Sequence, residues 1–287
     1  MIAASLKDGT LCFKEGDKHC KTNTTMLEYL RSGKYIIQSE INSPDLGAPL
    51  PETFCFLDGS AFLNHIELAR KARGAELPKD LYTIPLMYQG ISAPLLGSNE
   101  KIPLRNFEWG LDFEAEIGVV LSEVPEGISS KDSLKYIRFL CLFNDWTYRN
   151  LLGREAETGF GFIQSKPASS FAPYLVSPDE LNFLDGKLKT RVKVYRNHEL
   201  YGDLDTSEMF FSFGDLIEFG AKTRSLPAGT IIGSGTISNK GGFGCIAEKR
   251  AVEMIEGKEE LTSFLNTGEE IVISNDIFGE CRNRIVS

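Results

Sequence analysis

Alternating apolar and polar residues dominate the chain from about residue 84 onward, and this pattern predicts β-strands. Three stretches show it best, each bounded by turns rich in glycine or proline: DFEAEIGVVL (112–121), RVKVYRN (191–197) and TIIGSGTI (230–237). Side chains at positions i and i+2 of a strand face the same side, so each stretch offers one face to a core. The main part of the chain is therefore expected to be rich in β-structure.

Three other stretches have the apolar spacing of helices. TMLEYLRSG (25–33) should end at Gly33, because glycine readily adopts the left-handed conformation that closes a helix. GSAFLNHIELARKARGAELP (59–78) predicts a helix with Ser60 as its N-cap and Gly74 at its end. KDSLKYIRFLCLFND (131–145) predicts a third helix that is very apolar in its second half.

The predicted elements fall into two parts of the chain, a short N-terminal segment and a longer C-terminal part. Residues 1–45 contain a strand, a Lys-Asp-Gly turn, a second strand and the first helix, which is typical of a small α/β module. The stretch SPDLGAPLP (43–51) carries three prolines and a glycine and indicates a linker. We predict two domains, 1–45 and 51–287, in an α+β protein that is mainly β.

The charge and composition of the chain argue against some classes of binding partner. The chain has 287 residues and a formal net charge of −9, so neither nucleic acid nor a membrane surface is expected as a partner. Its six cysteines are scattered, without the close pairs of zinc or redox sites. No apolar run is long enough for a signal peptide or a membrane span, so a cytoplasmic location is expected.

Glu114 and Glu116 are the first candidates for chemistry. On a strand both carboxylates point the same way, and Asp112 shares that face. Carboxylates held together repel one another unless a cation separates them, which is the arrangement that hard metals use. An exposed acidic strand face is the competing interpretation, and this motif alone does not decide between the two.

Asp145 follows the apolar run RFLCLF, which would bring it close to the core. An ionised carboxylate in such a place needs a partner, and a metal ion or Arg149 could provide one. Alternatively, Asp145 simply caps the predicted helix.

Histidine is scarce, with three in the chain, which argues against a zinc hydrolase built on several histidines. His65 lies seven residues after Asp58. If the segment between them is helical, the two side chains share a face roughly 10 Å apart, with room for a small substrate between an acid and a base. A purely structural histidine is the alternative.

Two further segments could contact a ligand. Lys166 lies among small and apolar residues in GFIQSKPASSFAP (161–173), where a lysine either extends to solvent or is held by anions. The stretch GSGTISN (233–239) would let backbone N–H groups and Thr236 approach a ligand, although it lacks the spacing of a phosphate loop.

Taken in order, these motifs resemble the fumarylacetoacetate hydrolase family, in particular a bacterial branch of similar length. The matching strings span residues 58 to 250 and are DGSAFLNH, MYQG, DFEAEIG, NDWTYRN, QSKPASSFAP, LPAGTIIGSGTISN and CIAEKR. The resemblance implies a mixed β-sandwich roll as the core of the main domain, and a homodimer.

The resemblance also implies roles for particular residues. A divalent cation, with Mg²⁺ first and Mn²⁺ or Ca²⁺ as alternatives, would be bound by Asp58, Glu114, Glu116 and Asp145. The implied catalytic residues are His65 as base, Glu248 as the acid that orients it, and Lys166 as the group that stabilises developing charge. The implied substrate contacts are Tyr88, Arg149 and Thr236.

Two departures from the family pattern concern the substrate. Ser60 stands where the longer family enzyme has a tyrosine, and Leu152 stands where it has a glutamine. Both positions are on the substrate side in that enzyme, so we expect a substrate that is like fumarylacetoacetate or an acylpyruvate, without assigning fumarylacetoacetate itself.

The expected reaction is metal-dependent hydrolysis of a C–C bond in a 1,3-diketone or a 2,4-dioxo acid, with His65 activating water. One alternative is a decarboxylase or hydratase/lyase that acts on a small oxo-acid such as oxaloacetate. Another is a protein that binds metal and acids without catalysis.

Overall fold

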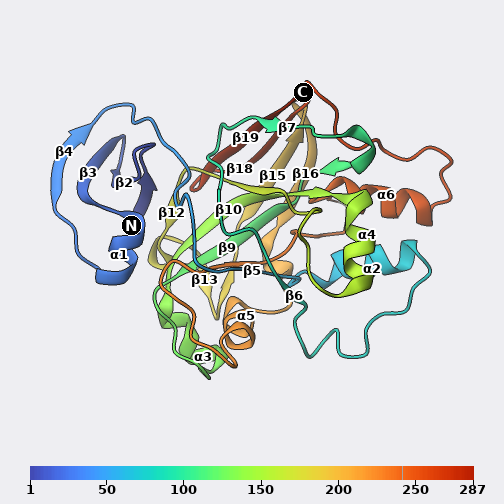
Figure 1. Cartoon of the computed structure of the whole chain (residues 1–287), viewed down its shortest axis with the longest axis horizontal. Helices are drawn as coiled ribbons and strands as arrows, with labels where there is room; N and C mark the ends of the chain where they lie inside the picture. The colour runs from blue at the N-terminus through green and yellow to red at the C-terminus, as the bar shows by residue number, and fades with distance from the viewer. Residues whose placement is uncertain (241) are drawn as a thin grey trace.

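The largest feature of the computed structural model, which describes residues 1–240 and 242–287, is a twelve-stranded sheet (Figure 1). Its main order is β4-β3-β2-β1-β12-β10-β9-β17-β5-β6, and β8 and β11 also pair with β10. The strands are β1 (Ile2–Ser5), β2 (Thr10–Glu15), β3 (Lys18–Thr25), β4 (Ile37–Ile41), β5 (Phe56–Gly59), β6 (Met87–Gln89), β8 (Leu111–Asp112), β9 (Ala115–Leu121), β10 (Ile137–Tyr148), β11 (Ala168–Phe171), β12 (Leu175–Val176) and β17 (Ile231–Gly233).

A second sheet of five strands, in the order β16-β15-β18-β19-β7, packs beside β10 and β11. Its strands are β7 (Ile102–Pro103), β15 (Arg191–Arg196), β16 (Glu199–Asp205), β18 (Glu270–Asn275) and β19 (Gly279–Val286), and β13 (Phe183–Leu184) forms a small hairpin with β14 (Lys187–Leu188). Fully buried apolar residues of both sheets, such as Ile117, Leu140 and Ile273, share one core. The prediction of a mainly β, α+β protein is confirmed.

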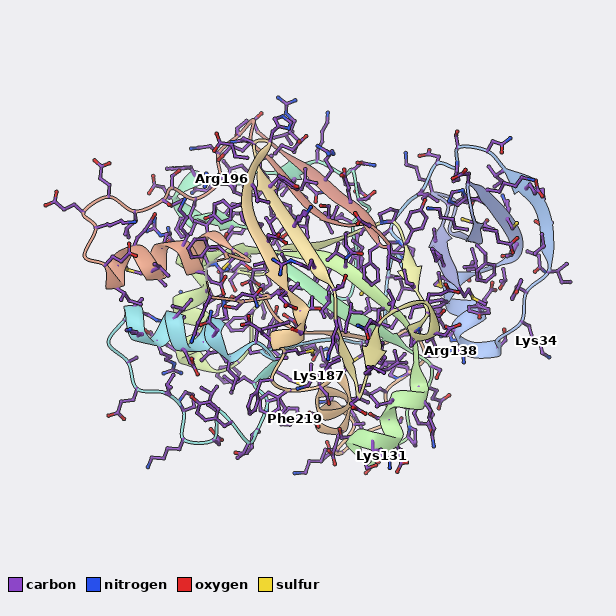
Figure 2. All side chains as sticks on the ribbon, turned by 180° about the vertical axis from the view of Figure 1, so that it is seen from behind. Lys34, Lys131, Arg138, Lys187, Arg196 and Phe219 are labelled. Carbon is purple, nitrogen blue, oxygen red and sulfur yellow. The ribbon has the colours of Figure 1, made fainter. Side chains whose placement is uncertain are left out.

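Three helices gather on one side of the sheets, where α2, α4 and α6 lie near one another in Figures 1 and 2. The helices are α1 (Met26–Ser32), α2 (Leu63–Ala72), α3 (Ser130–Ser133), α4 (Arg149–Thr158), α5 (Phe213–Gly220) and α6 (Ile246–Ile255). Among the described residues, no helix combines the length and apolarity needed to cross a bilayer.

The prediction of a helix over residues 131–145 is wrong for most of its length. A short helix begins after the N-cap Ser129, a 3-10 turn follows, and from Ile137 the chain is the long strand β10. Almost every residue of β10 is buried, because the strand is covered on both faces. Such a strand reads as a continuous apolar run, and periodicity alone does not separate it from a buried helix.

The N-terminal segment combines β1 to β4 with α1, and Figure 2 shows Lys34 at its outer side. Helix α1 has a capping box between Thr25 and Glu28 and ends at Gly33 with φ of 68°, as predicted. Strand β1 pairs antiparallel with β12, with Ile2 opposite Val176, so this segment continues the main sheet. Its independence as a domain over residues 1–45 remains a prediction.

Phe143 on β10 provides a test of the core. Its ring is fully buried, stacked on Phe171 at 5.1 Å between centroids and edge-on to Phe56 at 5.7 Å. Phe143→Ala should lower the free energy of unfolding by about 3–5 kcal/mol, because it leaves a cavity beside the two remaining aromatic rings. Urea denaturation measures the effect, with Phe160→Ala as control because Phe160 is 94% exposed. Equal losses in both variants would contradict this account of the core.

Candidate active site

Three carboxylates from three strands meet at one buried point. Asp58 lies on β5, Glu116 on β9 and Asp145 on β10, and ligand oxygens of the three lie within 4.8 Å of one another. Strand β17 runs between β5 and β9, and its Gly233 leaves the necessary room. A Cβ atom at Gly233 would lie 2.2 Å from Asp58 Oδ1, so any larger residue would displace this carboxylate.

Glu116 is the member of this cluster that has neither a hydrogen-bond partner nor a charged partner among the described residues. Among the described residues, neither of its buried carboxylate oxygens has a hydrogen-bond partner. Burial, followed by the charges of Asp58 and Glu114, raises the pKa of Glu116 well above its usual value. Burial and the charge of Asp145 raise the pKa of Asp58 to about 7. Oxygen ligands gathered at this spacing fit a hard divalent cation, which would remove the repulsion.

Two cations hold the neighbouring Glu114. Lys166 Nζ donates to Glu114 Oε2 and, at 2.7 Å, to Asp145 Oδ2, while Arg149 Nη2 donates to Glu114 Oε1 at 2.6 Å. Burial opposes the charge of Lys166, but Asp145 and Glu114 outweigh it and raise the lysine pKa. Burial also opposes the ionisation of Glu114, but Lys166 and Arg149 outweigh it and lower its pKa. Lys166 is therefore held by anions, one of the two alternatives that its sequence context allowed.

Two hydroxyl groups fix Asp145. Tyr88 donates to its Oδ2 at 2.6 Å, and Ser169 donates to its Oδ1 at 2.6 Å. The Tyr88 ring packs edge-on against Phe162 with 4.9 Å between centroids. Tyr88 thus contacts the carboxylate cluster directly, in addition to lining the cavity described below.

Asp112 ties the cluster to α6. One of its oxygens accepts from the Ile246 N–H at 2.8 Å, and the other accepts from the Ala247 N–H at 3.0 Å and from Arg149 Nε at 2.8 Å. The N-cap residue of α6, Cys245, makes no side-chain cap hydrogen bond, and Asp112 accepts instead from two of the N–H groups at the start of this helix. Asp112 therefore positions both Arg149 and the first turn of α6.

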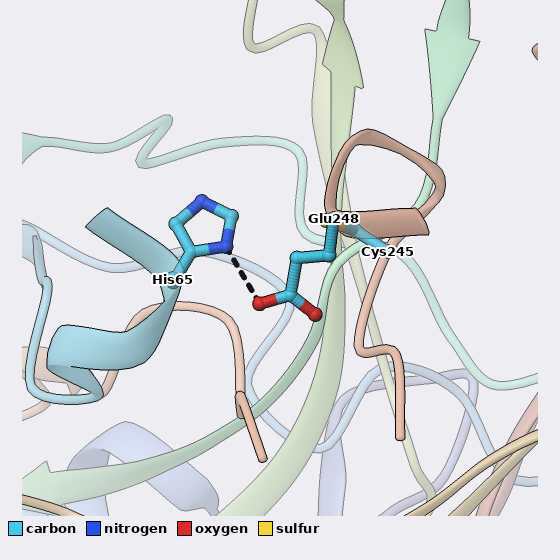
Figure 3. A group of neighbouring side chains, drawn as sticks. All are labelled: His65, Cys245 and Glu248. Atoms are coloured by element: carbon cyan, nitrogen blue, oxygen red, sulfur yellow. Dashed lines mark hydrogen bonds and ion pairs between the residues drawn. The ribbon is translucent and has the colours of Figure 1, made fainter. Parts of the chain in front are cut away.

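His65 and Glu248 form a second centre. His65 lies in the first turn of α2 and Glu248 in the first turn of α6, and His65 Nδ1 is 3.0 Å from Glu248 Oε1 (Figure 3). The other oxygen of Glu248 accepts from the Gly244 N–H at 2.8 Å. Glu248 is thereby fixed from both sides, and Nε2 of His65 is the ring nitrogen that remains to exchange a proton with a substrate.

Cys245 lies close to this pair but does not turn it into a metal site. Potential ligand atoms of the three residues fall within 4.8 Å of one another. Burial, followed by the negative charge of Asp112, raises the pKa of the Cys245 thiol well above its usual value. A neutral thiol is a poor metal ligand, whereas the His65–Glu248 hydrogen bond explains the arrangement fully.

One cavity of about 480 Å³ brings the two centres together. The predicted site residues that line it are Asp58, His65, Tyr88, Glu114, Glu116, Arg149, Lys166, Thr236 and Glu248, and Asp145 is bonded to two of them. Its wall also includes Ser60 and Leu152, the two positions that depart from the family pattern.

The local geometry around α2 differs from the expectation. Asp58 is on strand β5 and not on a shared helix with His65, and the N-cap of α2 is Phe62 without a side-chain hydrogen bond, not Ser60. The turn from β5 into α2 brings Asp58 and His65 to the same cavity nonetheless.

Comparison with known proteins shows the family. The family described as fumarylacetoacetate (FAA) hydrolase C-terminal matches residues 55–286. The chain belongs to the fumarylacetoacetate hydrolase family. A curated relative, oxaloacetate tautomerase YisK of Bacillus subtilis (strain 168), is 27% identical over 283 residues, covering 96% of this chain and 85% of the relative.

Solved structures show the same family fold. Fumarylacetoacetate hydrolase from Exiguobacterium antarcticum has a TM-score of 0.74 at 17% identity, covering 100% of this chain and 98% of that one. 5-Carboxymethyl-2-hydroxymuconate delta-isomerase from Mycobacterium smegmatis has a TM-score of 0.69 at 14% identity, covering 100% and 99%. The fumarylacetoacetate hydrolase fold therefore carries proteins named for hydrolase, isomerase and tautomerase activities.

Sequence reasoning missed two polar contacts of the site. Ser169, which fixes Asp145, lies in the quoted string QSKPASSFAP, but a serine among other small residues gives no signal of its own. Asp112 was placed on the acidic strand face, while its role as the cap of a helix 134 residues later depends on the tertiary fold.

Glu116→Gln tests the carboxylate cluster. The neutral amide removes repulsion among buried carboxylates, so the metal-free variant should unfold at a higher temperature than the wild type. Its affinity for Mg²⁺ should fall about tenfold or more, because it has lost a charged oxygen ligand. Thermal unfolding with and without Mg²⁺ and calorimetric titration measure both effects. A variant that keeps wild-type Mg²⁺ affinity would remove Glu116 from the metal site.

Asp112→Asn tests the link to α6. The substitution leaves Arg149 with one carboxylate partner in a buried place, and the free energy of unfolding should fall by about 3–5 kcal/mol. Asp203→Asn is the matched control, because Asp203 pairs with Arg191 at 2.8 Å on the surface, and it should change stability by less than about 1 kcal/mol. Urea denaturation measures the free energy of unfolding of both variants. Equal losses in Asp112→Asn and Asp203→Asn would refute the positioning role of Asp112.

Proposed function

We propose that this protein is a divalent-metal-dependent enzyme that moves a proton at the enolisable carbon of a small 2-oxo acid and so interconverts its keto and enol forms. The observation that carries the proposal is the His65–Glu248 pair, which shares one cavity with the buried carboxylate cluster. A proton acceptor and an anion-lined cation site in one cavity are what enolisation of an oxo acid requires.

The candidate ligands of the cation are Asp58, Glu116 and Asp145, with Glu114 beside them. Mg²⁺ is the first expectation, and Mn²⁺ or Ca²⁺ are alternatives, because all three prefer oxygen ligands. When bound, the ion would supply Lewis-acid stabilisation of negative charge on a substrate oxygen.

His65 is the proposed proton carrier. Glu248 accepts the hydrogen bond of Nδ1–H, which leaves the lone pair of Nε2 to take a proton from the substrate carbon. The electron pair of the broken C–H bond then forms the C=C bond of the enolate, and the carbonyl electrons move to oxygen. The positive charge of Lys166 favours this enolate, and His65 returns the proton to its oxygen to complete the enol.

Arg149 and Thr236 are the proposed substrate contacts, together with Tyr88. Arg149 uses Nε for Asp112 and Nη2 for Glu114, so it presents a fixed guanidinium to the cavity. Thr236 lines the same cavity and follows Gly235, whose backbone lies close to that of Gly59.

Leu152 bears on the shape of the substrate. Its side chain lines the cavity at a position that is on the substrate side in the longer family enzyme, so it affects which oxo acid fits and does not by itself separate proton transfer from hydrolysis. The similarity to oxaloacetate tautomerase YisK over 96% of the chain favours proton transfer over hydrolysis.

Hydrolysis of a C–C bond in a 2,4-dioxo acid is the second candidate. The likeness to a fumarylacetoacetate hydrolase structure agrees with it, and the His65–Glu248 pair could take a proton from water instead of carbon. The homodimer and the cytoplasmic location inferred from the sequence remain predictions.

Incubation of the Mg²⁺-loaded protein with oxaloacetate, an acylpyruvate and fumarylacetoacetate tests the proposal, with Mg²⁺ alone as the blank. Keto–enol interconversion changes the ultraviolet absorbance of the solution, because the amount of enol changes, while the mass of the substrate stays the same. Two acids that have gained water would instead establish hydrolysis, and release of carbon dioxide would establish decarboxylation.

His65→Gln should lower kcat on the responding substrate by about 10²–10⁴-fold, because the glutamine side chain has no ring nitrogen that can accept and return a proton. Its Mg²⁺ affinity should stay at the wild-type value, since His65 is not a candidate ligand. His198→Gln is the control, because the His198 side chain is 83% exposed, and its rate should be unchanged. Full turnover by His65→Gln would refute the proposed base.

A further inference from the structure

The outer part of the active-site cavity differs in charge from its inner end. The inner end is lined by Asp58, Glu114 and Glu116, whereas the outer wall, formed by α2 and α6, carries the arginines Arg73 and Arg250. The lining also includes apolar side chains, contributed by Leu152, Met254, Phe264 and several alanines. A ligand that fits this lining has a metal-binding end, a short apolar middle and a second anionic end.

Arg250 is held in place before any ligand arrives. Its Nη1 donates to the Thr262 carbonyl at 2.7 Å, and its guanidinium carbon lies 4.5 Å from the centre of the Phe264 ring, which also lines the cavity. The side chain is partly buried, so its charge is less screened than that of a surface arginine. A guanidinium fixed on a ring face and at one N–H is prepared to receive a carboxylate on its other N–H groups.

Arg73 closes the same part of the cavity from the end of α2. Its Nε donates to the Ala69 carbonyl at 2.9 Å, and the side chain is otherwise exposed. Within residues 1–240 and 242–287, neither Arg73 nor Arg250 forms an ion pair, whereas Arg149 and Arg196 each bind carboxylates. Two arginines without carboxylate partners in a chain of net charge −9 are available for an anion from outside.

We propose that Arg250, assisted by Arg73, binds a second carboxylate of the substrate, so that the enzyme selects dianionic oxo acids over oxo acids with an apolar tail. This inference rests on the proposed function, since it places the oxo-acid end of the substrate at the carboxylate cluster and its cation. Arg250 lies two residues after Glu248 on α6, and Arg73 is the C-cap of α2, the helix that carries His65 in its first turn, so binding of the distal carboxylate positions the substrate against the base.

Calorimetric titration of the Mg²⁺-loaded protein with matched acids tests this inference without any need for turnover. 2-Oxoglutarate and 2-oxopentanoate have equal chain length and differ in a distal carboxylate against a methyl group, and 2-oxoadipate and 2-oxohexanoate form a longer matched pair. The wild type should bind the diacid of at least one pair about tenfold more tightly or better, as expected for a charge-assisted hydrogen bond.

Arg250→Leu should abolish this preference while its affinity for the monoacid stays at the wild-type value. Arg73→Gln, a change on the surface with little structural risk, should reduce the preference in part. Lys249→Met is the matched control, because it removes a positive charge from the neighbouring position of α6, where Lys249 lies 5.2 Å from the centre of the Tyr201 ring and not on the cavity wall. The control should keep the wild-type preference.

Three results would overturn the arginine site: no diacid preference in the wild type, an unchanged preference in both arginine variants, or an equal loss of affinity for both acids in Arg250→Leu. The last result would mean that Arg250 only supports the segment around Thr262. Absence of turnover with every oxo acid overturns the proposed function but leaves these affinities measurable, so the two failures are distinguishable.

Discussion

The repulsion among buried carboxylates is the constraint around which this molecule is organised. Five acidic side chains crowd into one region of the sheet, and two cations, Lys166 and Arg149, offset part of their charge; the acids are Asp58, Asp112, Glu114, Glu116 and Asp145. The offset is uneven, because both cations bind Glu114 while the oxygens of Glu116 have no partner in the described residues. The carboxylates thus form a buried site whose negative charge is only partly neutralised, and this favours binding of a divalent ion over neutralisation by another side chain.

The sheet makes this arrangement rigid. Strands β9 and β10 pair along most of their length, with Glu116 opposite Phe143, so the carboxylates project from backbone that is hydrogen-bonded on both sides. The proposed base and its orienting acid lie instead on α2 and α6, which pack against each other at the edge of the cavity. Because the candidate cation site is on strands and the proposed proton carrier is on helices, the two can respond separately to substitution, and metal affinity and turnover are expected to separate in variants of His65.

The ten candidate residues that motif order selected lie together around one cavity, since each string carries its own polar group regardless of the element that holds it, and their roles remain predictions. The secondary structure around them was predicted less well. The prediction of a helix was wrong for β10, where burial on both faces hides the periodicity of a strand. The prediction of Ser60 as the N-cap of α2 was also wrong: the N-cap is Phe62, and Ser60 lines the cavity. The proposed roles of Arg250 and Asp112 could not be assigned from the sequence, because both depend on tertiary contacts. Arg250 is held against the ring of Phe264, and Asp112 accepts a hydrogen bond from the Ile246 N–H at the start of α6.

The hydrogen bond between His65 and Glu248 joins residues that are 183 positions apart in the chain. During synthesis the ribosome releases His65 long before Glu248, whereas Asp58, Glu116 and Asp145 have all emerged while α6 is still untranslated. Strand β17, which lies between β5 and β9 in the sheet, is translated only shortly before α6, so Asp58 and Glu116 are also brought together late. The proposed enzyme would therefore complete both its candidate cation site and its oriented histidine among the last events of its biogenesis.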